Sequence, residues 1–221
     1  MRQITPAICA RKRYKLTDVG CRTTKLLSTF TTVAKDKDEE SETFSFVVTQ
    51  LSAHLTDPLQ IDFASPGLFH QALEIANKHG TPEIIHAISK ASLYASIVAP
   101  DSGSNTPDST TPDPALDATA SHILTSITSS FASALFQPPP ALHMPCSDAV
   151  ADHWMEHVVT PALASNGLAD PFNTLSRISN LPWRDFGVCE ECVVELRRQW
   201  SVEALTLWKE MDVWMQESGA K

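Results

Sequence analysis

The chain has 221 residues, 43% of them hydrophobic, which is enough for one or two small domains with apolar cores. Its formal net charge of −9 disfavours nonspecific binding of the whole protein to nucleic acid. No apolar run is long enough for a membrane span or a signal peptide. We therefore expect neither nucleic acid nor a membrane among its partners.

The first 35 residues differ in charge from the rest, with eight basic side chains against one acidic side chain. Such a start is compatible with a mitochondrial transit peptide, a solvated arm or the first folded segment. Residues 1–13 are predicted to be a disordered basic arm. The five cysteines are an odd number without disulfide-scaffold density, so a reducing compartment, the cytosol or the nucleus, is expected.

Residues 14–19 could form a short strand, and residues 59–63 alternate apolar and polar side chains as an extended piece does. Residues 23–34 carry apolar side chains at helical spacing, although the threonines there weaken the helix prediction. The charge run of residues 35–42 indicates a solvated loop. Residues 44–55 then place five apolar side chains on one helical face.

Two helices are predicted next, because Ser65-Pro66 and Thr81-Pro82 are both typical helix starts. Gly80 ends the first helix, and the short connection makes the two a hairpin. The residues expected on their buried faces are Leu68, Phe69, Ala72, Leu73, Ala76, Ile84, Ile85, Ile88 and Ala91.

Residues 99–115 read APDSGSNTPDSTTPDPA and contain no large apolar side chain. Such a composition cannot bury enough surface to fold, so residues 99–116 are predicted to be a disordered linker. They would divide the chain into a first helical region at 14–98 and a second at 117–217. Limited proteolysis is expected to cut the linker first.

In the second region, helix starts are predicted at Asp117, Ser147 and Asp170-Pro171. The inward residues of these helices would be Ala120, Ile123, Leu124, Ile127, Phe131, Leu135, Val150, Trp154, Val158, Phe172, Leu175 and Ile178. The strand signals are few along the whole chain. The expected fold class is therefore mainly α, a helical bundle with a few short strands near the N-terminus.

The stretch 187–215 has the strongest helical period in the chain and predicts a helix roughly 40 Å long. Large aromatic rings on such a stripe favour burial, so this helix is expected to form the core of the second region. Its apolar stripe consists of Cys189, Cys192, Val193, Leu196, Trp200, Ala204, Leu207, Trp208, Met211 and Trp214.

Residues 61–91 end their first helix in the segment ANKHG at 76–80. This corner matches an A-x-K-[YH]-G pattern, and the stretch resembles the helix pair that closes fungal BTB/POZ domains. Residues 26–32 (LLSTFTT) are similar to a preceding helix of that family. The family's opening strand-rich dimerisation segment has no recognisable counterpart.

The second half resembles the tail of basidiomycete BTB proteins, on three features. Cys146 is followed by a helix containing Trp154, and Cys189-x-x-Cys192 opens the terminal helix. The W-x-x-L-P ending of that family is absent here. The resemblance implies a noncatalytic protein-protein interaction module, which would oligomerise or would connect a partner to a cullin-type ubiquitin ligase.

The pair Cys189 and Cys192 permits three interpretations. A C-x-x-C at a helix start is used by redox sites, but those need a βαβ context that the sequence lacks. A zinc site needs about four ligands, which Cys146 with His143 or His153 could complete, at a spacing that looks irregular. The third interpretation is simple packing of two small side chains. We favour packing and expect no bound metal, no other cofactor and no reversible redox cycle, and keep a small metal-binding or redox protein as the alternative function.

His153 and His157 lie four residues apart on one predicted helix, with Glu156 between them, and could also bind a metal. The order HWMEH is not the H-E-x-x-H of zinc proteases, and Trp154 beside them favours a packed face. The chain contains no nucleophile elbow, phosphate-binding loop or dinucleotide fingerprint. An enzyme is therefore not expected.

Overall fold

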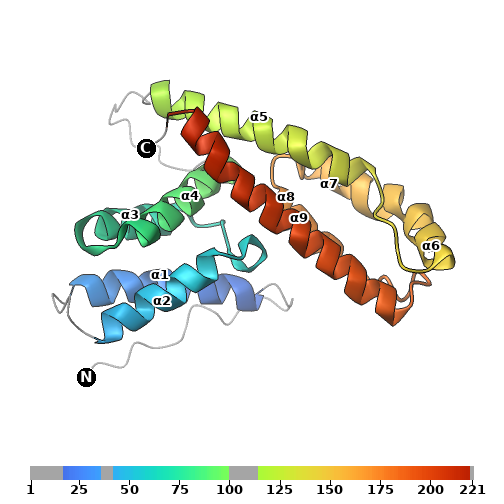
Figure 1. The fold of residues 1–221 in the computed structure, drawn as a ribbon, viewed down its shortest axis with the longest axis horizontal. Coiled ribbons are helices and arrows are strands. Elements are labelled where there is room, and N and C mark those ends of the chain that lie inside the picture. The colour runs from blue at the N-terminus through green and yellow to red at the C-terminus, as the bar shows by residue number, and fades with distance from the viewer. Residues whose placement is uncertain (1–16, 36–41, 100–113, 220–221) are drawn as a thin grey trace. The chain divides into compact units, whose positions relative to one another are not determined.

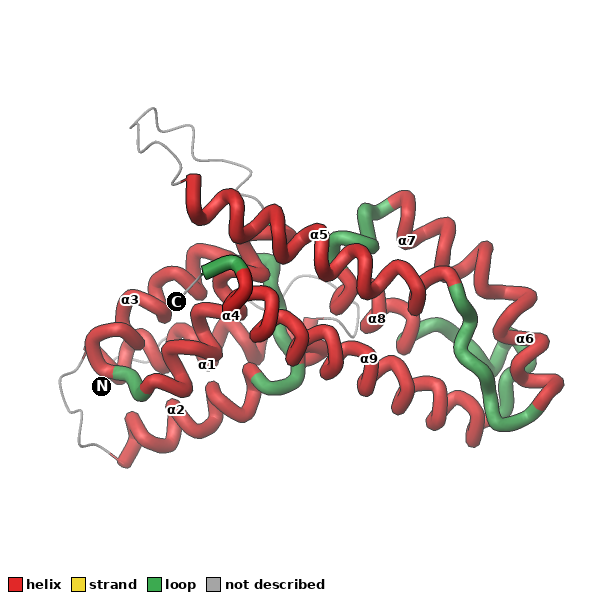
Figure 2. The backbone as a smooth tube through the Cα atoms, turned by 45° about the horizontal axis from the view of Figure 1, so that its top comes forward, coloured by secondary structure: helices red, strands yellow, loops and turns green. Residues whose placement is uncertain are grey.

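The computed structural model describes residues 17–35, 42–99 and 114–219. The chain divides into two compact units, residues 1–104 and residues 105–221 (Figure 1). Within the described residues every regular element is a helix, and Figure 2 shows helices joined by loops without a strand. The expectation of a mainly α fold is confirmed. The predicted linker falls mostly at residues 100–113, outside the described residues, as does the basic arm at 1–13.

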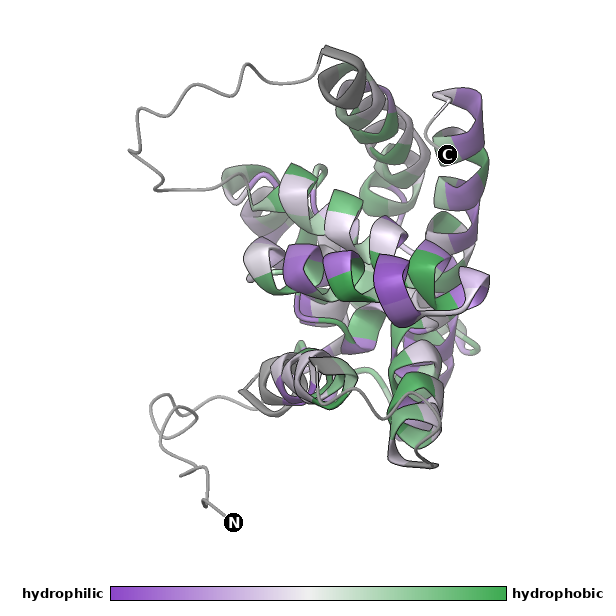
Figure 3. Cartoon of the chain, turned by 90° about the vertical axis from the view of Figure 1, so that its left-hand side faces the viewer, coloured by the Kyte–Doolittle hydropathy of each residue, from purple (hydrophilic) through white to green (hydrophobic). Residues whose placement is uncertain are grey.

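The first unit contains α1 (Thr17–Lys35), α2 (Glu42–Leu55), the short 3₁₀ helix η1 (Pro58–Gln60), α3 (Pro66–His79) and α4 (Pro82–Val98). Helix α1 packs against α2 and α3, and α3 and α4 form the expected hairpin. Figure 3 shows hydrophobic and hydrophilic residues mixed along the helices, as amphipathic helices require. The core residues of this unit include Phe30, Leu51, Phe69, Ile84, Ile88 and Tyr94, which are at most 1% exposed.

The expected strand at residues 14–19 is wrong where the structure describes it, whereas the expected extended piece at residues 59–63 is correct in part, because residues 61–63 lie outside any helix and Ile61 has an extended backbone. Residues 17–19 form the first turn of α1, and residues 58–60 form η1, whose start is capped by the Asp57 carboxylate. A strand needs a neighbouring strand for its backbone hydrogen bonds. In the segment after η1, two backbone groups bond to the Thr23 hydroxyl instead. This hydroxyl donates to the Gln60 carbonyl and accepts from the Asp62 N–H.

The second unit contains α5 (Pro114–Phe136), α6 (Met144–Trp154), a π-helical turn at Met155–Val159, α7 (Thr160–Ala164), α8 (Pro171–Ser179) and α9 (Glu190–Glu217). Helices α5 and α8 both pack against α9. The Trp183 ring lies 6.2 Å from Trp154 and 5.6 Å from Trp200, and both Trp154 and Trp183 donate their indole N–H to a backbone carbonyl. The long helix therefore closes an aromatic core, as its stripe predicts.

Four predictions for this unit are wrong. Helix α5 begins at Pro114 rather than at Asp117, so residues 114–116, which were expected to belong to the linker, are helical. Helix α6 begins at Met144, because Pro145 fits a helix start, while the Ser147 hydroxyl instead accepts the Ala141 N–H. Cys189 is exposed at the N-cap of α9, and Trp214 is only half-buried.

None of the helices that the structure describes is both long and apolar enough to cross a bilayer.

Candidate metal centre

Four side chains from two distant segments meet at one end of the second unit: those of His143, Cys146, Cys189 and Cys192. One potential ligand atom from each lies within 4.8 Å of all the others. His143 and Cys189 are exposed, whereas Cys146 and Cys192 are buried. The described residues contain no other group of three or more histidine, cysteine or acidic side chains placed to share a metal ion.

The two pairs occupy equivalent positions on their helices. His143 is the N-cap of α6 and Cys146 lies three residues later, while Cys189 is the N-cap of α9 and Cys192 lies three residues later. Both N-caps have extended backbone, with ψ of 138° and 159°. A cap and the third residue of its helix come together at the helix start, so each pair presents two ligands side by side.

The distances within the cluster suit a tetrahedral ion. His143 Nδ1 lies 3.4 Å from Cys189 Sγ and 3.4 Å from Cys192 Sγ. Zinc bonds of about 2.3 Å to sulfur and about 2.0 Å to nitrogen place tetrahedral ligands roughly 3.5–3.8 Å apart. The Cys189 N–H also points at Cys146 Sγ, at 3.5 Å. A single ion could therefore reach all four ligand atoms with only small side-chain adjustments.

The pKa values of the two thiols of the C-x-x-C are shifted in opposite directions. The pKa of Cys189 is lowered to about 7, first by the backbone N–H of Cys192 and then by the His143 ring. Burial raises the pKa of the Cys192 thiol. All three cysteines are free thiols. A metal ion would need all three as thiolates, so its binding would release protons.

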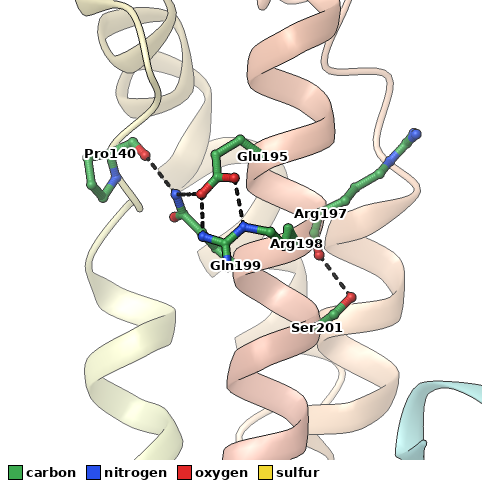
Figure 4. Close-up of polar contacts among 6 residues, drawn as sticks. All are labelled: Pro140, Glu195, Arg197, Arg198, Gln199 and Ser201. Carbon is green, nitrogen blue, oxygen red and sulfur yellow. Dashed lines mark hydrogen bonds and ion pairs between the residues drawn. The ribbon is translucent and has the colours of Figure 1, made fainter.

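The loop before His143 is tied to α9 by a chain of polar contacts (Figure 4). The Gln199 amide donates to the Pro140 carbonyl at 3.3 Å and to the Glu195 carboxylate at 3.1 Å. Arg198 binds the same carboxylate with two N–H groups, and together these donors hold the pKa of Glu195 at about 2. These contacts join the loop that precedes His143 to α9.

The other histidine pair of the sequence analysis has a different role. The ring of His157 stacks on Phe186 and the ring of His153 packs against it at a tilt, with 4.6 Å and 4.5 Å between centroids. Phe186 in turn packs edge-on against Trp183. The structure thus places both rings in a packed aromatic group, and His143 rather than His153 joins the cysteines.

The spacing of the four ligands along the chain explains why a zinc site was not favoured from the sequence. The order His143-x-x-Cys146 repeats the spacing of Cys189-x-x-Cys192, and paired ligands with two residues between them are typical of structural zinc sites. The spacing that looks irregular along the chain is therefore two regular pairs. The exposed position of Cys189 also contradicts the expectation that both members of the C-x-x-C simply pack.

Comparison with known proteins identifies no family for this chain. No protein-family model, no curated protein and no solved structure matches the chain.

Proposed function

We propose that the second unit is a zinc-binding domain, in which His143, Cys146, Cys189 and Cys192 hold one structural Zn²⁺. The observation that carries the proposal is the convergence of one imidazole and three thiols from two helix starts within 4.8 Å. Thiolate and imidazole ligands together favour zinc over magnesium or calcium, which prefer oxygen ligands.

The ligand count supports a structural role rather than a catalytic one. Catalytic zinc keeps a position for water or substrate, whereas four protein ligands close the coordination sphere. The ion would join the start of α6 to the start of α9, where the small side chains of Cys146, Val188 and Cys192 form the buried layer. Because such a site exists only in the folded chain, its binding free energy becomes folding free energy.

The proposal is tested by metal analysis of the full chain purified without added metal. We expect about one zinc per chain. Cys146→Ser, Cys192→Ser and His143→Gln should each lose most of the zinc, because three ligands bind less tightly than four. Cys9→Ser and Cys21→Ser change the two cysteines outside the second unit and serve as matched controls that should retain it.

Cobalt substitution gives a second measurement that does not depend on purification history. Tetrahedral Co²⁺ with three thiolates should show sulfur-to-metal charge-transfer bands, and these should weaken in Cys192→Ser. Metal-free protein that binds neither zinc nor cobalt, with an unchanged melting temperature, would refute the site.

The interaction module implied by the BTB/POZ resemblance is a second, separate proposal. It is supported by the α3–α4 hairpin, whose corner carries the ANKHG segment at residues 76–80. Light scattering of the purified chain would test for a homo-oligomer, and titration with a purified cullin would test the adaptor role. A monomer without measurable cullin affinity would reject both forms of the proposal.

A further inference from the structure

The three sulfurs of the proposed zinc site differ in their access to solvent. Cys189 is exposed at the N-cap of α9, whereas Cys146 is 6% exposed and Cys192 is fully buried. Oxidation of cysteines by dissolved oxidants follows thiolate character and exposure. A solute reaching this site would therefore meet the Cys189 sulfur first.

A partner thiol lies directly behind the exposed one. Cys192 is three residues further along, in the first turn of the same helix, and its sulfur lies within 4.8 Å of the Cys189 sulfur. Both sulfurs approach the same His143 nitrogen at 3.4 Å. Cysteines three residues apart at a helix start are near enough in the chain for a disulfide after a local adjustment that leaves the rest of the helix in place. Cys146 lies within the same distance but belongs to another helix, so a disulfide to it would need movement between two helices rather than within one turn.

We propose that a peroxide-class oxidant converts Cys189 and Cys192 into a disulfide and expels the zinc, which makes the site an oxidation-sensitive cross-link. This inference rests on the zinc site proposed above and adds its regulation. The exposed sulfur is the point of attack, and the buried sulfur is the resolving thiol.

The reaction balances with hydrogen peroxide as the only co-reactant. The Cys189 sulfur attacks one peroxide oxygen, the O–O bond breaks, and the departing hydroxide takes a proton to give water. The Cys192 thiolate then attacks the sulfur of the resulting sulfenic acid, forms the S–S bond and displaces hydroxide, which takes a proton from solvent to give a second water. Two thiolates lose two electrons, the peroxide gains them, and Zn²⁺ dissociates as the aqueous ion.

The structural consequence is local. After oxidation only His143 and Cys146 remain as ligands, and both belong to the α6 side of the site. Two ligands cannot retain a structural zinc, so the metal link between the two helix starts is lost. A thiol reductant with added zinc restores the ligands and the link.

The test uses the full zinc-loaded chain, treated with increasing hydrogen peroxide. Zinc release is followed with a chromophoric chelator, and the protein is digested with trypsin without reduction. Both cysteines of the pair lie in one tryptic peptide, residues 185–197, because Arg184 and Arg197 bound it. We expect that peptide to lose two hydrogens in proportion to the zinc released, and both changes to reverse with dithiothreitol and zinc.

Cys189→His is the matched variant, since it keeps four possible zinc ligands but cannot form the disulfide. Its zinc release by peroxide should be slower by roughly tenfold or more, because the exposed thiolate is absent. If this variant does not bind zinc, the tryptic peptide map of the unmodified chain shows whether Cys189 and Cys192 form the disulfide. Zinc retained at peroxide doses that oxidise an exposed model thiol, a peptide linked through Cys146, or irreversible sulfinic acid at Cys189 would each overturn the inference. Absence of zinc before treatment would instead reject the zinc site itself.

Discussion

Among the described histidines of the first unit, His54 is the most buried, with 6% of its surface exposed. Its Nε2 lies 2.8 Å from the Thr23 hydroxyl, the same group that satisfies the backbone after η1. Burial lowers the pKa of His54, and the positive charge of Arg22 adds to this effect, while Asp57 opposes it. The folded unit therefore resists protonation of this ring.

The first prediction is that the first unit loses stability as the pH falls below about 6.5, the ordinary pKa of histidine. The unfolded chain takes up the proton more readily than the folded one, so stability is complete above that pH and declines as the pH falls through the lowered pKa. Urea unfolding at pH 7 and pH 5 measures the difference. His54→Gln should reduce it, whereas His122→Gln, at an exposed position, should not. An equal pH dependence in all three proteins would contradict the assignment.

A second prediction at this scale concerns Trp200, which is 4% exposed and packs against Trp183. Truncation to alanine should cost about 3–5 kcal/mol, a large part of the stability of a small domain. Thermal denaturation should show a clear drop in the melting temperature of the second unit. Val213→Ala, on the same helix but 51% exposed, is the control that should change it little. An unchanged melting temperature in Trp200→Ala would show that the ring does not support the core.

At the scale of elements, the corner between α3 and α4 requires a close backbone approach at Gly80. The Gly80 N–H donates to the Ala76 carbonyl at 2.6 Å. A Cβ atom on Gly80 would lie 2.6 Å from the Ala76 oxygen and 2.9 Å from a methyl group of Ile84. The backbone of Gly80 is extended, with φ of −91°. Glycine is therefore needed here for space rather than for an unusual conformation.

The third prediction follows from that contact. Gly80→Ala should destabilise the first unit by about 1–3 kcal/mol, as overpacking does in a tight site. Gly67→Ala provides the comparison, because its added Cβ would meet no atom within 4 Å and glycine is unfavourable within a helix. Urea unfolding should move the two variants in opposite directions. Destabilisation by both, or by neither, would contradict the steric argument.

Elements defined by local pattern were predictable from the sequence, and contacts made across the fold were not. Residues 44–55 and the hairpin after Ser65 show helical periodicity and start signals within a few residues, so their helices were found. Residues 14–19 have an ambiguous short pattern, and their pairing depends on neighbours that the sequence does not reveal. The sequence offered the cluster as a possible zinc site but did not favour it for the same reason, because Cys146 and Cys189 lie 43 positions apart and meet only through the packing of the second unit.

At the scale of the whole molecule, the chain consists of two helical units, each with its own core. The composition of residues 99–115 predicts a protease-sensitive connection between them. The fourth prediction is that brief digestion with proteinase K cuts there first and yields two resistant fragments, identified by mass spectrometry. Trypsin is unsuitable for this test, since the chain has no lysine or arginine between Lys90 and Arg177. First cleavage within either helical unit would contradict the division.

The placement of all four ligands in the first turns of α6 and α9 has an electrostatic consequence. Three thiolates and one divalent ion carry a net charge of −1, and a helix N-terminus carries about half a positive elementary charge from its aligned peptide dipoles. Two such ends meeting at one centre come close to neutralising it. No side-chain cation is then required beside the ion, and Arg184, close in sequence, instead pairs with Glu190. The backbone of two helices would thus act as the counter-ion of the proposed zinc centre, so Arg184→Ala should leave its zinc content unchanged.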